Sequence, residues 1–395
     1  MPDALGNDLE MCRKRRGRRR LALWGAFALL IVAAAVGGVV LSARAPSRSG
    51  TRSGLWAGPG EHLVPVGLAV SPDGERLAVN PRADTSTAST VIGLMPVHGG
   101  APRWVDTGLG VAAHFTWSPD SSKVAFAGLG EGGRGSMHIA VCDFTAGETS
   151  ALVRPRSRVV DLWPQWSPTG EWIAFQRRRF AANGRDTSDT WIVRPDGQDA
   201  RNATHSGHVA MVGGAWSADG RELYYVQRDP GGQSPTRGDV YVVAIGQGHA
   251  TPRRLTSGIR AKFVVPSSCG EYLQCHAETE EGESSIQVLP IADPSHPVAV
   301  LPGGPSPVVS PDGQWLAFLD HWKQGPHTRT YELWKMPITK PEKRMKLADE
   351  VCALATLGWT AAGEIVFCRR TSIWAVRQDG ADERLILELP EHVVF

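Results

Sequence analysis

One pattern of apolar and polar positions repeats along most of the chain. The unit is a short apolar segment, a four-residue polar turn and a second apolar segment, as in HFTWSPDSSKVAF from His114 and WPQWSPTGEWIAF from Trp163. Such runs, bounded by Pro, Asp and Gly, are typical of β-strands joined by tight turns. Seven turns follow one another at intervals of 43 to 50 residues, and they begin at Ser71, Ser118, Ser167, Ser217, Ser267, Ser310 and Thr360.

The Ser-Pro-Asp-Gly composition of these turns has a direct physical reading. Pro presets φ at the second position, Asp can accept a bond from a downstream amide, and Gly tolerates the positive φ that closes the turn. Each repeat continues with a third strand, such as DTWIVRPDG from Asp189, and most have a short fourth one, such as Arg254–Thr256. Four antiparallel strands in ~45–50 residues are typical of a propeller blade.

The sequence therefore predicts an all-β fold, a seven-bladed β-propeller over residues 61–395. The fifth repeat is the weakest, because Pro266 and Cys269 disturb its turn, and without it the ring has six blades. Seven complete repeats need no exchanged strand, so we expect blade one to pack against blade seven. An extra strand at residues 392–395 is the alternative.

Tryptophan recurs at the end of the first strand of several repeats. Trp117, Trp166, Trp216 and Trp359 each stand directly before the turn. Large apolar residues that return with a structural repeat are expected to fill the interface between neighbouring repeats. We expect these four indoles to lie in the core between blades.

The phrase Trp-Ser-Pro-Asp-Gly followed by Leu/Val-Ala-Phe resembles the TolB-type, WD-like propeller repeat, over roughly residues 62–395. The resemblance implies the fold. TolB itself carries an α/β domain before a six-bladed propeller and is soluble in the periplasm. This chain departs from it, with seven repeats preceded by a linker at residues 44–60 rich in Ser, Gly, Arg and Pro. The resemblance therefore leaves the partner open.

Residues 21–43, LALWGAFALLIVAAAVGGVVLSA, contain no charged residue. About 20 apolar residues cross a hydrocarbon core of roughly 30 Å, so this run predicts one transmembrane helix. A cleaved signal peptide is the alternative, but its apolar region usually spans only ~7–15 residues. We expect a signal anchor.

Charge is concentrated before this run. Residues 1–20 hold seven Lys/Arg against three acids, so a chain of net charge +2 has a body of net charge −2. Basic residues favour the cytoplasmic side, which predicts a single-pass protein of the cytoplasmic or inner membrane, with residues 1–20 inside and the propeller outside, periplasmic or extracellular. A nearly neutral body argues against nucleic acid as a partner.

Catalytic signatures are missing from the sequence. It contains no Gly-x-Ser-x-Gly, His-Glu-x-x-His or Gly-x-x-x-x-Gly-Lys motif, so we predict no catalytic residues and no cofactor, and an enzyme is the less favoured reading. His205 and His208 are read as polar loop residues, because two ligands alone do not make a metal site. Cys352 and Cys368 flank one hairpin of the last blade and form either a disulfide or buried thiols.

Candidate binding residues fall on predicted rim loops and at the channel mouth. The rim candidates are four arginines on a loop of the third blade, and a His-Trp pair on the equivalent loop of the sixth. The channel candidates stand on the strands before the turns, which the TolB-type blade order places innermost. In full these residues are Arg177, Arg178, Arg179, Arg185, His321 and Trp322 at the rim, and His114, Trp163 and Gln165 at the channel.

The sequence thus predicts a membrane-anchored propeller that acts as a protein-interaction platform in the cell envelope, with an envelope or secreted protein as partner. A rigid scaffold that carries variable loops is where binding surfaces usually arise. The alternative is a propeller enzyme, lyase-like or hydrolase-like, or a glycan-binding protein that uses the central channel.

Overall fold

Seven antiparallel sheets of four strands each make up the described part of the chain in this computed structural model. The predictions for residues 1–20, 21–43, 44–60 and 392–395 lie outside the described residues, and so does Arg185. The chain divides into two units, Met1–Trp56 and Ala57–Phe395, and every described residue belongs to the second. The structure describes residues 63–83, 91–109, 112–129, 137–153, 158–181, 186–209, 214–228, 238–246, 250–267, 269–279, 283–302, 307–324, 329–352, 357–360, 362–369 and 372–388.

The first four blades use sixteen consecutive strands. These are β1 Leu63–Val70, β2 Arg76–Ala83, β3 Val91–Pro96 and β4 Arg103–Asp106 in blade 1; β5 Ala112–Trp117, β6 Lys123–Leu129, β7 Met137–Asp143 and β8 Glu148–Ala151 in blade 2; β9 Val159–Trp166, β10 Ile173–Arg179, β11 Thr187–Val193 and β12 Arg201–Asn202 in blade 3; and β13 Ala215–Trp216, β14 Glu222–Gln227, β15 Asp239–Ala244 and β16 Arg253–Arg254 in blade 4.

The last three blades follow the same order. They are β17 Ala261–Pro266, β18 Tyr272–Glu278, β19 Ser284–Pro290 and β20 Ala299–Pro302 in blade 5; β21 Val308–Val309, β22 Trp315–Gln324, β23 Arg329–Pro337 and β24 Met345–Cys352 in blade 6; and β25 Gly358–Trp359, β26 Glu364–Arg369, β27 Ser372–Arg377 and β28 Arg384–Glu388 in blade 7. One turn of 3-10 helix, Pro341–Lys343, joins β23 to β24. In the described part of the chain, no helix is long and apolar enough to cross a membrane.

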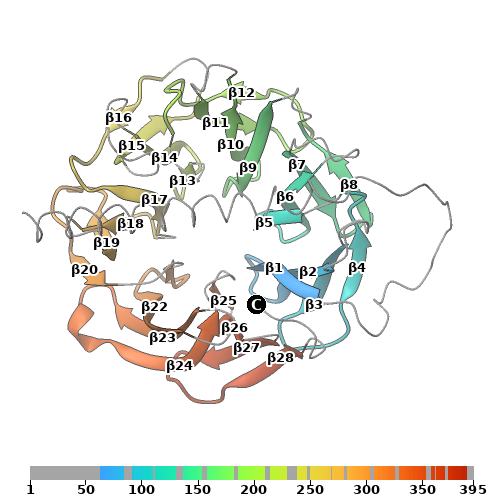
Figure 1. Cartoon of the computed structure of the whole chain (residues 1–395), viewed down its shortest axis with the longest axis vertical. Helices are drawn as coiled ribbons and strands as arrows, with labels where there is room; N and C mark the ends of the chain where they lie inside the picture. Colours follow the sequence, from blue (N-terminus) through green and yellow to red (C-terminus); the bar gives the residue numbers. More distant parts are fainter. Residues whose placement is uncertain are drawn as a thin grey trace, which may run out of the picture. The chain divides into compact units, whose positions relative to one another are not determined.

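Each blade consists of four strands that are consecutive in sequence, and the ring in Figure 1 places the first strand of a blade inside and the fourth outside. The prediction of seven blades is confirmed. The fifth repeat forms a complete sheet, β17 to β20, so the six-bladed alternative is wrong. Among the described strands none is exchanged between blades, and closure rests on packing, as expected.

The turn between the first two strands is held by its serine as well as by its aspartate. In blade 2, the Ser118 hydroxyl donates to the Asp120 carboxylate at 2.5 Å, and it accepts the Lys123 amide at 2.9 Å. The carboxylate also accepts the Ser122 amide at 3.0 Å, and these bonds hold the pKa of Asp120 below its usual value. The predicted role of Asp is confirmed, while the serine acceptor explains why Ser opens six of the seven turns.

The four recurring tryptophans are core residues, as predicted, with at most 9% of their surface exposed. Three of them also bind the preceding blade through the indole N–H. Their acceptors are main-chain carbonyls at one repeated position of the innermost strand: Trp117 donates to Ala69 at 3.1 Å, Trp216 to Gln165 at 2.9 Å and Trp359 to Val308 at 3.4 Å. The fourth, Trp166, donates instead within its own turn, to Gly170 at 3.4 Å.

The two cysteines predicted to flank one hairpin belong to different blades. Cys352 ends β24 in blade 6, and Cys368 lies on β26 in blade 7, so they are not partners in one sheet. Both are thiols buried in the core where blades 7 and 1 meet. Burial, and then the neighbouring Cys352, raise the pKa of the Cys368 thiol. The reading as buried thiols holds, because the chain crosses to the next blade between the two residues.

Ring closure joins blade 7 to blade 1 through apolar packing and one arginine. Leu77 and Met95 of blade 1 share a core with Val366 and Ile373 of blade 7. The Arg384 guanidinium donates to the Val97 carbonyl across the junction at 3.1 Å and to the Glu364 carboxylate in its own blade at 2.5 Å. Blade 7 is therefore fastened to blade 1 without a shared strand.

We expect Gly358→Ala to weaken this closure. A Cβ at Gly358, on the innermost strand of blade 7, would lie 2.3 Å from Cγ2 and 3.1 Å from Cβ of Val70 in blade 1. Val70 is stiff at χ1, so the strain falls on the junction and costs about 1–3 kcal/mol of unfolding free energy.

Urea unfolding of this variant and two others tests the closure. Gly246→Ala is the matched control, because a Cβ there meets nothing within 4 Å. The double variant Val70→Ala/Gly358→Ala should recover most of the loss. A Gly358→Ala protein as stable as the Gly246→Ala control would contradict the proposed contact.

Candidate functional site

Two aromatic side chains occupy the same special position on the innermost strands of blades 2 and 3. His114 on β5 and Trp163 on β9 each stand four residues before the turn serine, and both have positive φ, 59° and 49°. In each strand the register shifts at this point, so that two residues oppose one. Positive φ is costly for residues other than Gly and tends to persist where function or packing demands it.

These two bulges bring the rings together. Their centroids are 4.9 Å apart, with an interplanar angle of 47°. Both side chains are half-buried, and so is Gln165, whose main-chain carbonyl already accepts the Trp216 indole. The structure thus places all three channel candidates on innermost strands and brings His114 and Trp163 into contact.

His114 is neutral at physiological pH. Protein atoms surround the imidazole closely although part of it reaches solvent, and this burial lowers the pKa of His114 to about 4. Its Nδ1 is buried and has no hydrogen-bond partner among the described residues. A neutral imidazole beside an indole face can exchange hydrogen bonds with a small polar ligand and stack against its apolar side.

The rim arginines of blade 3 do not lie on a loop as predicted. Strand β10 runs on to Arg179, because Arg177, Arg178 and Arg179 pair with residues of both neighbouring strands, β9 and β11. A strand that ends in three charged residues resembles a loop in sequence, but its backbone continues the ladder. The strand geometry sends alternate arginines to opposite faces of the sheet.

Arg177 is a structural residue and not a rim contact. Its Nε donates to Asp161 Oδ1 at 2.8 Å, and its Nη2 donates to Oδ2 at 2.7 Å. Asp161 on β9 is fully buried, and the Arg177 side chain is only 10% exposed. The guanidinium carbon also lies 4.3 Å from the centre of the Trp191 ring. The ion pair is buried inside blade 3, so Arg177 is not exposed to a partner at the rim.

Burial dominates the electrostatics of this pair. It raises the pKa of Asp161, while Arg177 and, more weakly, Arg179 oppose that rise. A carboxylate held in two charge-assisted bonds at 2.7–2.8 Å is nevertheless well accommodated as an anion. The ion pair therefore depends on Arg177, because nothing else in the described surroundings of Asp161 donates two bonds to it.

Arg178, Arg179 and Phe180 do reach the surface where β10 ends. Phe180 is 37% exposed, and the Arg178 guanidinium carbon lies 5.3 Å from its ring centre. Arg179 is exposed and lies 5.4 Å from the Trp191 ring. The half-buried Arg178 and the exposed Arg179 and Phe180 thus lie at the blade 3 rim, with Arg178 against the Phe180 ring and Arg179 towards Trp191.

Arg228, which sequence reasoning missed, is an arginine of the neighbouring blade 4. It follows β14, and its amide donates to the His208 carbonyl at 2.9 Å. The side chain is half-buried, and within the described part of the chain its buried Nε has no hydrogen-bond acceptor. Burial, and then the nearby positive charge of Arg178, lower the pKa of Arg228. Aligning the repeats would have found it, since Arg178 and Arg228 both stand eleven residues after their turn serines, Ser167 and Ser217.

The His-Trp pair of blade 6 also lies in a strand and not in a loop. His321 and Trp322 belong to β22, at a shift in register that falls between Asp320 and Lys323. His321 has φ 48° and is exposed, with its Nε2 3.6 Å from Asp320 Oδ2 and its ring 5.7 Å from that of Trp334. The Trp322 side chain lies outside the described residues. This pair is in a different blade from the arginine group and shares no described contact with it.

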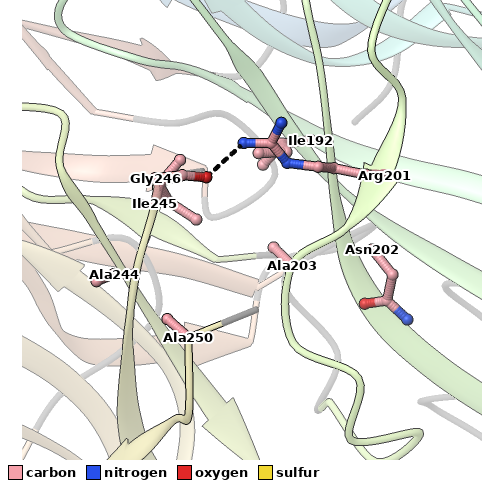
Figure 2. A pocket seen from close by; sticks show the side chains of 8 residues that line it. All are labelled: Ile192, Arg201, Asn202, Ala203, Ala244, Ile245, Gly246 and Ala250. Carbon is pink, nitrogen blue, oxygen red and sulfur yellow. Dashed lines mark hydrogen bonds between the residues drawn. The ribbon is translucent and has the colours of Figure 1, made fainter. Parts of the chain in front are cut away.

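Two surface hollows lie away from these residues. One, of about 200 Å³, separates the outer strands of blades 3 and 4, and Figure 2 shows Arg201 across it, donating to the Gly246 carbonyl at 3.1 Å. The other, of about 600 Å³, lies between blades 4 and 5 and is lined by residues such as Arg260, Gln287 and Pro297. Neither hollow includes a predicted site residue. Among the described residues, no three His, Cys, Asp or Glu side chains are grouped to hold a metal ion.

Comparison with known proteins identifies the fold. No family model matches the sequence, and no curated protein does. Among solved structures, the chain is similar to a puromycin hydrolase, at 13% identity and TM-score 0.61, covering 83% of this chain and 54% of that one. It is similar to an oligogalacturonate lyase solved in complex with manganese, at 10% identity and TM-score 0.59, covering 84% and 90%. TolB from Acinetobacter baumannii matches at 17% identity and TM-score 0.49, covering 70% and 64%.

Likenesses at these identities show the fold and nothing further. The chain spans 64% of TolB and about half of the puromycin hydrolase. The likenesses to the puromycin hydrolase and the lyase, together with the seven four-stranded sheets, define the class of protein: an all-β, seven-bladed propeller.

Proposed function

We propose that this chain is a membrane-anchored interaction platform of the cell envelope. Residues 21–43 hold it in the membrane, residues 1–20 remain in the cytoplasm, and the propeller binds an envelope or secreted protein outside. Support for the anchor comes from the uncharged run and the basic residues before it. Fold alone does not give function, so the binding role must rest on a particular surface.

The surface that carries the proposal is the exposed end of β10. Several arginines elsewhere on the propeller are held by carboxylates, such as Arg384 by Glu364 at 2.5 Å, Arg369 by Glu383 at 2.5 Å and Arg344 by Asp320 at 3.4 Å. Over the ranges that the structure describes, Arg178 and Arg179 make no salt bridge. They stand beside the exposed Phe180. Arginine next to an exposed aromatic ring is the composition enriched at protein interfaces.

Exchanging these two arginines for serine should impair partner binding and spare the fold. In an in-cell cross-linking pull-down of the full-length protein, we expect Arg178→Ser/Arg179→Ser to lower recovery of the main partner by roughly tenfold, about 1.4 kcal/mol of binding free energy. Arg221→Ser/Arg253→Ser removes the same charge from exposed positions of blade 4 and serves as the control. Equal recovery by all three proteins would count against this surface.

The central channel supports a second candidate, an enzyme or a glycan-binding protein. The observation in its favour is the His114–Trp163 contact, with its strained backbone and unpaired Nδ1. The lyase among the structural neighbours shares the fold at 10% identity, and its substrate is not carried over to this chain. Recovery of membrane background alone in the pull-down would favour this candidate over the platform.

A further inference from the structure

The outermost strand of blade 5, β20, differs from the outermost strands of the other six blades because it carries no charge. It lies on the outside of the ring in Figure 1 and reads Ala-Val-Leu-Pro over Ala299–Pro302. Charged side chains on an edge strand discourage another chain from pairing with it, and the edge of β20 lacks this protection. The strands β4, β8, β12, β16, β24 and β28 each carry at least one charged residue, such as Arg103, Glu148, Arg201, Arg253, Lys346 and Arg384.

Two valines on one face of this edge are exposed. Val300 is 57% exposed, and Val298, which immediately precedes β20, is 43% exposed. The alternate residues Ala299 and Leu301 are buried in the core between blades 5 and 6. One face of the strand is therefore packed against the next blade, while the opposite face presents apolar side chains to solvent.

The exposed face of β20 borders the larger of the two hollows, of about 600 Å³. Val300 stands directly opposite Gln287 of β19, and residues that are directly opposite share one face of the sheet. Gln287 lines the hollow, and so does Pro297, the residue before Val298. In the described part of blade 4, the outermost strand β16 is only two residues long, and the valines on the side of that blade remain uncovered.

The hollow contains an arginine without a counter-ion. Two arginines, Arg254 and Arg260, and one carboxylate, that of Glu278, line it. Arg254 is already held by the buried Asp239. Within the described part of the chain Arg260 makes no hydrogen bond or salt bridge, and its φ of 55° is costly for a residue other than Gly. A carboxylate is the group whose two oxygens match a guanidinium, so a ligand that reaches into this hollow is expected to carry one.

We propose that the outer edge of blade 5 binds an extended segment of a partner protein. The segment adds a strand beside β20, lays apolar side chains against Val298 and Val300, and directs an acidic side chain into the hollow towards Arg260. In this mode of recognition main-chain hydrogen bonds give affinity, and contacts of alternate side chains give specificity. Because Pro297 precedes the edge and Pro302 ends it, only a few residues pair. The surface is separate from the end of β10 in blade 3, and its test does not depend on that surface.

Selection from a random octapeptide library displayed on phage, against the full-length protein in phosphatidylcholine nanodiscs, tests the proposal. We expect enrichment of peptides with β-branched or aromatic residues at alternate positions and one Asp or Glu. A selected peptide should bind Val300→Lys about tenfold more weakly than wild type, because the variant places a charge on the edge. Leu385→Lys, at an exposed apolar position of the outermost strand of blade 7, is the matched control and should bind like the wild type.

The contact with the acidic side chain is tested by Arg260→Gln. In the wild type, replacing the Asp or Glu of a selected peptide by its amide should weaken binding by about tenfold. In Arg260→Gln the same replacement should have no effect, and selection should no longer favour Asp or Glu. Arg253→Gln removes an exposed arginine of β16 that does not line the hollow, and this control should retain the preference.

A third measurement needs no variant of the protein. Methylation of single main-chain nitrogens of a selected peptide removes its hydrogen-bond donors one at a time. For a peptide that pairs with β20, methylation should weaken binding at alternate positions and spare the positions between them, because successive N–H groups of a strand point to opposite sides. This pattern remains informative even if Val300→Lys does not fold.

Five results would overturn the proposal. These are the absence of any enriched pattern of alternating residues, equal peptide affinity in wild type and Val300→Lys, an unchanged preference for acidic residues in Arg260→Gln, and the same effect of methylation at every position. The fifth is sedimentation of the wild type in detergent as a dimer that Val300→Lys converts to a monomer, which would assign the edge to a second copy of this chain.

Discussion

Trp216→Ala is expected to destabilise the propeller by about 3–5 kcal/mol, the range for emptying a large buried aromatic site. Trp216 is 6% exposed and packs between blades 3 and 4 against Trp172, Ala174 and Val243. Its indole also donates to the Gln165 carbonyl at 2.9 Å, so the variant leaves both a cavity and an unpaired carbonyl. Urea unfolding followed by tryptophan fluorescence and far-UV dichroism measures the loss.

A comparison of two conservative variants isolates the hydrogen bond. Phe retains most of the ring volume but has no N–H. Trp216→Phe should therefore lower the free energy of unfolding by about 1 kcal/mol more than Trp166→Phe does. The reason is that the Trp166 indole donates only within its own turn, whereas the Trp216 indole donates to another blade. Equal costs for the two Phe variants would show that the inter-blade bond contributes nothing measurable. Unchanged stability of Trp216→Ala would reject the core assignment itself.

The fold could be predicted because each blade repeats the same local chemistry. Ser, Pro, Asp and Gly define the turn through contacts within six residues, as Ser118, Asp120 and Lys123 show. Because this local turn pattern occurs seven times, once in each repeat, it predicts the number of blades and the order of their strands. The link from Trp216 to Gln165 could not be read in this way, because it joins residues 51 apart through a main-chain carbonyl that carries no sequence signal.

The candidate site was predicted less well, because charge alone does not distinguish a strand end from a loop. Arg177 seemed equivalent to Arg178 and Arg179, but it stands opposite Asp161, 16 residues earlier in the chain, and binds it. Alternation along β10 separates it from Arg178, and its deeper position in the blade separates it from Arg179. The burial of Asp161 depends on how the blade packs, which no local pattern records. Arg228 does not belong to a run of arginines in the sequence. It becomes noticeable only when the repeats are aligned, because it then occupies the same position as Arg178.

For the channel residues, the placement could be predicted from the sequence but the contact between them could not. Their placement on innermost strands followed from the blade order, and the structure agrees. The contact between His114 and Trp163 did not follow, because it requires a bulge in each strand that reverses the sign of φ. Bulges of this kind depend on pairing across the sheet, and no turn residue marks them in the sequence.

Arg177→Met is expected to destabilise the propeller by about 3–5 kcal/mol at neutral pH, since it removes the partner of a fully buried carboxylate. Methionine retains much of the apolar stem that packs on Trp191, so the loss reports mainly the uncompensated charge of Asp161. Arg177→Met/Asp161→Asn removes both charges and should recover most of the stability. A double variant as unstable as the single one would point to lost packing instead.

The pH dependence of the single variant provides the sharper test. Burial already raises the pKa of Asp161, and without Arg177 that pKa rises further. A carboxyl group whose pKa is higher in the folded state than in the unfolded chain binds its proton more tightly when folded. Its contribution therefore becomes less favourable as pH rises through the unfolded value of about 3.9 towards the folded value.

The cost of Arg177→Met, relative to wild type, should accordingly be largest at neutral pH and shrink as the pH falls into the range where Asp161 takes up its proton. Urea unfolding at neutral and mildly acidic pH, run in parallel for wild type, Arg177→Met and Arg177→Met/Asp161→Asn, measures this slope. The double variant has no carboxyl group at position 161, so its difference from wild type should vary with pH far less than that of the single variant. A cost that is independent of pH in Arg177→Met would show that the buried charge of Asp161 is not what Arg177 neutralises.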